Sequence, residues 1–163
     1  MVQVFIGIGS NLGDKIANIK LAISRINIEL GLVVAQSGLY ESEPWGFDSS
    51  EMFVNGVLEI NTIYPAQKLL DGLKKIESDL GRAKKNDHIY RDRLIDLDIL
   101  YYGDISIHIN GLEIPHPRIY DRRFVLEPMV EIAPNFIDLK YNKTMKELLN
   151  GCSDVSLLKK ILN

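Results

Sequence analysis

Several features that mark other classes of protein are scarce or missing in this chain. A single cysteine, Cys152, excludes an intrachain disulfide framework and a cysteine zinc site. Three histidines are too scattered to indicate a histidine-built metal centre. The first residues lack a basic region and turn polar after Ile8, unlike a signal peptide, and no apolar run could span a bilayer. We therefore expect a cytoplasmic protein without a membrane partner.

Strong positive charge and internal repetition are missing as well. The net charge is −3 and the pI is about 5.6, which argues against nucleic acid as a partner. No repeat, low-complexity tract or linker divides the 163 residues. A hydrophobic content of 46% is ordinary for a globular protein and sufficient for a core. We expect a single domain over residues 1–163 and a monomer.

Apolar periodicity predicts an alternation of strands and helices. The predicted strands cover 2–9, 32–42, 52–61 and 94–102, and the predicted helices cover 14–30 and 65–80. The order β-α-β-β-α-β is typical of an α+β, ferredoxin-like sandwich with both helices on one face of an antiparallel sheet. We further predict C-terminal helical additions, namely a helix over 121–132 capped by Asp121 and short helices near 144–150 and 154–162.

The segment "LIDLDIL" (94–100) combines an apolar strand with two carboxylates. In a strand, Asp96 and Asp98 share one face, with Cα atoms roughly 6–7 Å apart, while Ile95, Leu97 and Ile99 share the other. The acid pair either faces water and nearby arginines or forms a site for a hard cation such as Mg²⁺, which prefers carboxylate and phosphate oxygens. The pattern alone leaves both interpretations open.

Basic residues gather immediately before this strand. They are Arg82, Lys84, Lys85, Arg91 and Arg93, and "IPHPRIYDRRF" (114–124) adds His116, Arg118, Arg122 and Arg123. A charge-rich loop is usually solvated, but cations beside a carboxylate pair are also typical of a polyphosphate site. A Walker loop is missing, so a P-loop protein is excluded.

Phe53 and Asn55 lie on one face of the predicted strand 52–61. In the predicted sheet, this is the same open face that carries Asp96 and Asp98. An exposed aromatic ring and an amide suit a flat heterocycle, which the ring would stack on and the amide would hydrogen-bond. Alternatively, a loop covers Phe53 and Asn55 pairs with the backbone.

These motifs, in this order, resemble the 6-hydroxymethyl-7,8-dihydropterin pyrophosphokinases of folate biosynthesis. The resemblance spans nearly the whole chain and includes "GIGSNLGD" (7–14), "YESEPWG" (40–46), "FVNGV" (53–57), "IESDLGR" (76–82), "RLIDLDILYYG" (93–103), "IPHPR" (114–118) and "RRFVLEP" (122–128). It implies an enzyme that transfers a diphosphate from MgATP to the hydroxymethyl group of the pterin and releases AMP.

The resemblance also implies residue roles. Asp96 and Asp98 would hold two Mg²⁺ ions that arrive with ATP, and Arg82 and Arg93 would act with them in catalysis. The implied ATP-binding residues are Glu77, Arg82, Lys84, Arg93, Ile99, His116 and Arg122. The implied pterin-binding residues are Ser42, Glu43, Trp45, Phe53, Asn55 and Phe124, with the ring between the two phenylalanines.

Two other functions remain compatible with parts of the pattern. A ferredoxin-like sheet could bind RNA on Phe5 and Phe53, although two aspartates on that face would repel phosphates. An acid pair could also serve a two-metal phosphodiesterase, which usually needs more carboxylates or histidines than this segment supplies.

Overall fold

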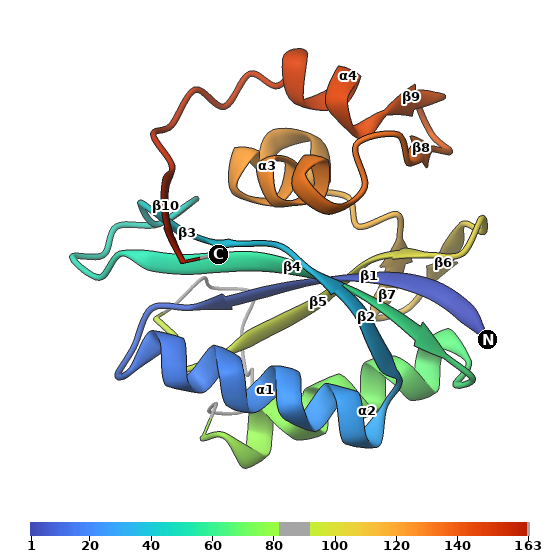
Figure 1. The fold of residues 1–163 in the computed structure, drawn as a ribbon, viewed down its shortest axis with the longest axis horizontal. Helices are drawn as coiled ribbons and strands as arrows, with labels where there is room; N and C mark the ends of the chain where they lie inside the picture. The colour runs from blue at the N-terminus through green and yellow to red at the C-terminus, as the bar shows by residue number, and fades with distance from the viewer. Residues whose placement is uncertain (82–91, 163) are drawn as a thin grey trace.

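The computed structural model describes residues 1–81 and 92–162, and within them the central element is a six-stranded antiparallel sheet (Figure 1). Its strands are β1 (Val2–Ser10), β2 (Leu32–Gln36), β3 (Leu39–Ser42), β4 (Phe53–Thr62), β5 (Asp96–Tyr102) and β10 (Lys159–Leu162). The order is β10-β3-β4-β1-β5, and β2 pairs with the far part of β4. Strand β1 therefore lies between β4 and β5, the two strands that carry most of the candidate site.

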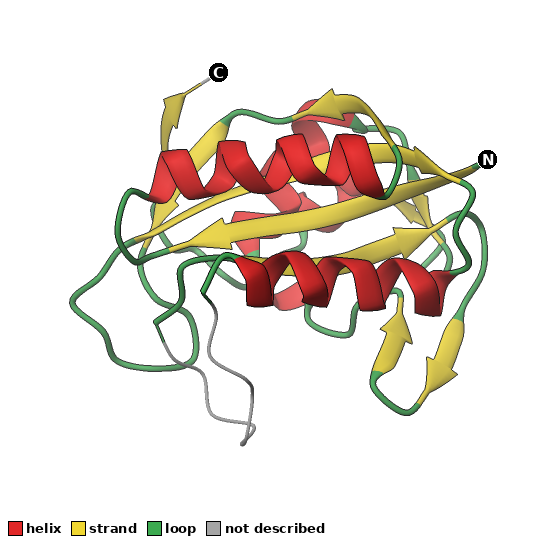
Figure 2. Ribbon diagram, turned by 90° about the horizontal axis from the view of Figure 1, so that it is seen from below, coloured by secondary structure: helices red, strands yellow, loops and turns green. Residues whose placement is uncertain are grey.

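Helices α1 (Lys15–Glu29) and α2 (Ala66–Asp79) lie side by side on one face of this sheet (Figure 2). The Asp14 side chain begins α1 by accepting a hydrogen bond of 3.0 Å from the backbone N–H of Ala17, as an N-cap residue does. The helices contribute Ile19, Ala22, Ile26, Leu69, Leu73 and Ile76 to the core. The strands contribute Val4, Ile6, Ile8, Leu58, Ile60, Leu97 and Ile99, and Ile95 joins them from the position just before β5. The predicted inner face of 94–100, with Ile95, Leu97 and Ile99, is thus confirmed.

A second core lies on the opposite face of the sheet, where α3 (Arg123–Ile132) and α4 (Met145–Asn150) pack (Figure 1). A 3₁₀ turn, η1 (Ile119–Asp121), leads into α3. This core consists of Phe5, Val57, Leu100, Tyr101, Ile119, Val125, Leu126, Met129 and Met145. The predicted helices 121–132 and 144–150 thus exist, with shifted starts, and cover part of the face that carries the acid pair.

Two short hairpins complete the described chain. One joins β6 (Ile107–Ile109) to β7 (Leu112–Ile114), and the other joins β8 (Ile137–Asp138) to β9 (Lys143–Thr144). Among the helices of residues 1–81 and 92–162, none has the length and hydrophobicity needed to cross a membrane.

The single strand predicted over 32–42 is divided at Ser37 into β2 and β3. The Ser37 hydroxyl donates to the carbonyl of Gly38 at 2.8 Å and accepts from the N–H of Val57 at 2.9 Å. A serine side chain that bonds to nearby backbone replaces regular strand pairing. Alternating apolar residues on both sides hid this break.

The helix predicted over 154–162 is wrong, because the chain there ends in strand β10, which pairs with β3. The Glu131 carboxylate of α3 holds this strand by accepting from Lys160 Nζ at 2.9 Å and from the Tyr40 hydroxyl at 2.7 Å. A free sheet edge and a matching charge therefore outweigh the helix propensity of a Leu- and Lys-rich segment.

Two side chains have environments other than those predicted. Asp121 lies in η1 and does not cap α3, whose N-cap residue is Arg122 without a side-chain cap bond. Phe5 is 1% exposed, and its ring centroid lies 4.9 Å from that of Phe136. Phe5 is therefore core and is not a stacking platform for RNA.

Candidate active site

A cavity opens at the end of the sheet where β1 and β3 finish and β4 and β5 begin. Strands β1, β4 and β5 line it with Gly7, Ile8, Gly9, Phe53, Asn55, Gly56, Asp96, Asp98 and Leu100. The end of β3 and the loop after it, the segment before β5 and the start of α3 add Ser42, Glu43, Trp45, Phe47, Arg93, Arg122, Phe124 and Val125. The cavity therefore brings together the acid pair, two arginines and all six residues predicted to bind a pterin.

Glycine in β1 forms the middle of the cavity floor. Gly9 pairs with Asn55 of β4 on one side and with Asp96 of β5 on the other. A Cβ atom at Gly9 would lie 2.7 Å from Asn55 Oδ1, closer than real Cβ contacts come. Because Gly9 has no side chain, the Asn55 amide can pack directly against the backbone of β1.

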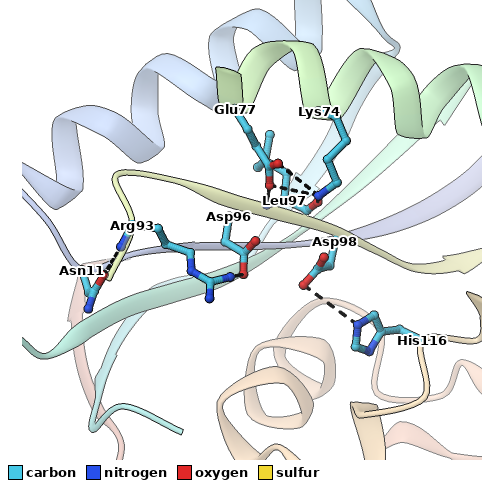
Figure 3. A network of polar contacts seen from close by, with 8 residues as sticks. All are labelled: Asn11, Lys74, Glu77, Arg93, Asp96, Leu97, Asp98 and His116. Atoms are coloured by element: carbon cyan, nitrogen blue, oxygen red, sulfur yellow. Dashed lines mark hydrogen bonds and ion pairs between the residues drawn. The ribbon is translucent and has the colours of Figure 1, made fainter. Parts of the chain in front are cut away.

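Asp96 and Asp98 point to the cavity face of β5, as the alternation predicted. Arg93 Nη1 donates to Asp96 Oδ2 at 2.6 Å, and His116 Nε2 lies 4.0 Å from Asp98 Oδ2 (Figure 3). Their side chains keep 22% and 33% exposure, so both carboxylates remain accessible to a ligand. Within residues 1–81 and 92–162, no three His, Cys, Asp or Glu side chains are grouped to hold a metal ion.

The orientation of His116 is set by the backbone around it. Its N–H donates to the Leu100 carbonyl at 3.0 Å, and its Nδ1 accepts from the N–H of Arg118 at 3.2 Å. In the neutral ring, Nε2 therefore carries the proton and faces Asp98. Burial lowers the pKa of His116, while the Asp98 carboxylate acts in the opposite direction. The Nε2–H of the neutral ring therefore points toward Asp98 without reaching hydrogen-bond distance.

Glu77 of α2 lies on the helix side of β5, with 2% exposure. Its Oε1 accepts from the Leu97 N–H at 2.7 Å, and Lys74 Nζ lies 3.1 Å from its Oε2 and 3.4 Å from the Leu97 carbonyl (Figure 3). Ile99 is in the core beneath the helices and, like Glu77, does not line the cavity. Their contact with a nucleoside stays a prediction, while Glu77 clearly fixes the residue between the two aspartates.

Aromatic and amide groups form the opposite side of the cavity. Asn55 Nδ2 donates to the Ser42 hydroxyl at 2.9 Å, and both residues are buried. Phe53 meets Phe47 edge to face, with ring centroids 6.1 Å apart. Phe47 was missed by the sequence analysis, although an aromatic residue in the loop before Phe53 was a visible signal.

Arg122 connects the aromatic side to the charged side. Its guanidinium carbon lies 4.7 Å from the Trp45 ring centroid and 5.7 Å from that of Phe124. Arg118, which was counted only among the basic residues, lies 5.6 Å from the same Trp45 ring. Such stacking is typical of arginine beside aromatic rings. The loop residue Trp45 is thereby joined to the start of α3.

Four of the basic residues that precede the acid pair in sequence fall outside the described residues. They are Arg82, Lys84, Lys85 and Arg91, in the segment 82–91. The contacts with phosphate predicted for Arg82 and Lys84 therefore stay predictions.

Comparison with known proteins gives consistent matches over most of the chain. A model of the 7,8-dihydro-6-hydroxymethylpterin-pyrophosphokinase family matches residues 5–134. The chain is 40% identical over 147 residues to a 2-amino-4-hydroxy-6-hydroxymethyldihydropteridine pyrophosphokinase of Aquifex aeolicus, covering 90% of each protein. It is 33% identical over 160 residues to the protein of the same name from Haemophilus influenzae, covering 98% of each.

Solved structures show the same fold at lower sequence identity. The crystal structure of a Plasmodium falciparum HPPK-DHPS triple mutant with SDX-DHP matches 92% of this chain with a TM-score of 0.76 and 16% identity. This chain spans 44% of that Plasmodium chain. At this identity the likeness concerns the fold alone.

Proposed function

The chain belongs to the 7,8-dihydro-6-hydroxymethylpterin-pyrophosphokinase family, and from this we propose that it transfers diphosphate from MgATP to 6-hydroxymethyl-7,8-dihydropterin. The hydroxymethyl oxygen would bond to the β-phosphorus and lose its proton, while the bond from that phosphorus to the oxygen bridging to the α-phosphate breaks. AMP leaves with the bridging oxygen, and the pterin diphosphate enters folate synthesis. One observation carries the proposal: aromatic side chains, the Asn55 amide and the acid pair line a single cavity.

The aromatic side suits the pterin. A ring between Phe53 and Phe124 would present its polar edge to Asn55, whose amide already has a defined direction through its bond to Ser42. The main chain of Ser42, Glu43 and Trp45 would supply the remaining hydrogen bonds. The hydroxymethyl group would then point across the glycine floor toward β5.

The charged side suits ATP with two Mg²⁺ ions. Asp96 and Asp98 present carboxylate oxygens to the cavity. Mg²⁺ is commonly bound by one or two carboxylates together with the phosphates of a substrate. When bound, the ions would offset charge on the phosphate oxygens. Arg93, His116 and Arg122 would donate hydrogen bonds to the same phosphates, together with Arg82 and Lys84. Catalysis would depend chiefly on positioning and electrostatics.

Several finer points belong to this proposal. The strand order, with β1 between β4 and β5 and with α1 and α2 on one face, supports a ferredoxin-like sandwich with C-terminal additions. Residues 1–163 would act as one pyrophosphokinase domain, as a monomer, in the cytoplasm. The monomeric state and the cytoplasmic location are expectations only.

The test is AMP release from MgATP with and without the pterin. We expect release to require the pterin, and we expect Asp96→Asn and Asp98→Asn to lower turnover by about 100-fold or more while the protein stays folded. Asp104→Asn removes the same charge just after β5 and should be close to wild type, because Asp104 does not line the cavity.

Near-normal AMP production by either site variant would refute the role of the acid pair. Phosphodiester cleavage without a pterin acceptor would instead indicate the two-metal phosphodiesterase. Salt-sensitive RNA binding in the absence of Mg²⁺ would indicate the RNA-binding module.

A further inference from the structure

The turn "GSNLGD" (9–14) contains a buried amide for which the proposed reaction gives no role. Asn11 is 0% exposed although it follows β1 directly and lies in a connection between a strand and a helix. A fully buried amide side chain requires hydrogen-bond partners. Asn11 finds them about 80 residues further along the chain.

Asn11 holds the segment that leads into the acid pair. Its Oδ1 accepts from the N–H of Arg93 at 2.7 Å, and its own N–H donates to the Arg93 carbonyl at 3.1 Å (Figure 3). Its Nδ2 donates to Asp92 Oδ1 at 2.6 Å. The backbone N–H and the backbone carbonyl of Arg93 are therefore both hydrogen-bonded to Asn11.

The same amide reaches the loop on the aromatic side of the cavity. Asn11 Nδ2 lies 3.5 Å from the carbonyl oxygen of Glu51, near the end of the loop between β3 and β4. Lys15, the first residue of α1, donates to the Met52 carbonyl at 2.7 Å. The turn after β1 is thus connected to the segments that border both sides of the cavity.

Fixing the Arg93 peptide also fixes where its side chain begins. The guanidinium reaches Asp96 Oδ2 at 2.6 Å, and the Arg93 side chain is only 10% exposed, so it has little freedom to correct a displaced backbone. A shift of about 1 Å in a group that orients reactants can lower a rate about 100-fold.

We propose that Asn11 is a positioning residue, which holds the Arg93 main chain so that the guanidinium of Arg93 stands beside Asp96 and meets the phosphates of ATP. The inference deepens the proposed function and rests on it. Asn11 itself does not line the cavity and is not expected to contact either substrate.

The decisive experiment exchanges the two partners. Asn11→Asp places a carboxylate against Asp92 and should lower kcat/KM for MgATP about 10- to 100-fold in protein that is fully folded at the assay temperature. Asp92→Asn keeps an oxygen acceptor for Asn11 and should be close to wild type. The double variant N11D/D92N restores a donor and an acceptor in reversed order and should recover most of the lost activity.

A matched control separates this role from general stability. Asn18 Nδ2 donates to the Leu12 carbonyl at 3.0 Å, so Asn18→Ala removes an amide hydrogen bond from the same turn without touching Asp92 or Arg93. We expect it to lower the melting temperature and to leave kcat and KM unchanged. If Asn11→Asp behaves in the same way, or if the double variant shows no recovery, the proposal is overturned.

A second measurement does not depend on the reaction. Asn11→Ala leaves the Arg93 N–H without its acceptor, so exchange of this amide with deuterium, followed by NMR, should accelerate about tenfold or more. Asn18→Ala should leave it unchanged. If wild-type protein releases no AMP, the proposed function fails, and this exchange rate alone then decides whether Asn11 holds Arg93. An unchanged rate would refute the holding contact.

Discussion

Removal of the Glu77 carboxylate is the sharpest test of how the helix layer supports the acid pair. Glu77 is 2% exposed and accepts a 2.7 Å hydrogen bond from the N–H of Leu97, which is itself 0% exposed. Leu97 lies between Asp96 and Asp98 on the edge strand β5. Glu77→Ala therefore leaves the buried Leu97 N–H without an acceptor, between the two residues whose carboxylates form the acid pair.

The structure gives the expected size of the effect. A hydrogen bond to a charged group contributes about 1.5–3 kcal/mol, and a buried donor left without a partner costs about 1–3 kcal/mol. Because these two terms overlap, we expect Glu77→Ala to lower the free energy of unfolding by about 3 kcal/mol. For a chain of this size that corresponds to a fall of about 6–12 °C in Tm. Glu77→Gln keeps an oxygen acceptor and should cost about 1 kcal/mol.

Urea denaturation without ligands measures this effect, with the slope m checked for constancy. Lys74→Ala is the control, because the Lys74 side chain is 40% exposed and its ion pair should contribute less than about 1 kcal/mol. If Glu77→Ala unfolds within about 0.5 kcal/mol of wild type, the Leu97 contact does not support β5. A purely nucleoside-binding role for Glu77 would then be the better explanation.

Two more predictions follow from buried polar groups. Asp138 is 0% exposed and accepts hydrogen bonds from the hydroxyls of Tyr101 and Tyr120 at 2.9 and 2.8 Å. Asp138→Ala should therefore lower the free energy of unfolding, measured by urea titration, by about 3 kcal/mol. An unchanged midpoint would contradict this. Burial lowers the pKa of His116 in the folded chain. In the presence of a chelator, the contribution of the neutral His116 to stability should therefore be complete above the unfolded pKa of about 6.5, and it should be lost as the pH falls below that value. His116→Gln should lack that component, and identical pH profiles for the two proteins would refute it.

Sequence pattern was most informative where burial alternates along a strand. The separation of Asp96 and Asp98 from Ile95, Leu97 and Ile99 was predictable, because each residue of a strand alternates sides and only one side was apolar. The six pterin-side residues were named from the family resemblance, and all of them line one cavity. Their binding of a pterin stays a prediction, whereas the two faces of 94–100 follow from the local pattern alone.

Contacts between distant segments could not be predicted in this way. The Leu- and Lys-rich segment near Lys159 forms a strand only because β3 offers a free edge and Glu131 a matching charge. In the sequence, Asn11 looks like an ordinary turn residue. Its partners Asp92 and Arg93 lie about 80 residues away, so the neighbouring residues do not indicate them. In each case the deciding interaction has no signature in the neighbouring sequence.

The position of Gly9 between Asn55 and Asp96 has a consequence for the size of substrate that the cavity admits. Each pair of neighbouring strands is separated by about 4.8 Å, so the backbones that carry the amide and the carboxylate stand about 10 Å apart. Main-chain hydrogen bonds maintain this distance, so side-chain rotation does not alter it. If Asn55 binds the edge of a heterocycle, the strand spacing limits the length of the substrate. An acceptor with a longer chain between its ring and its hydroxyl group would place the hydroxyl oxygen beyond the acid pair.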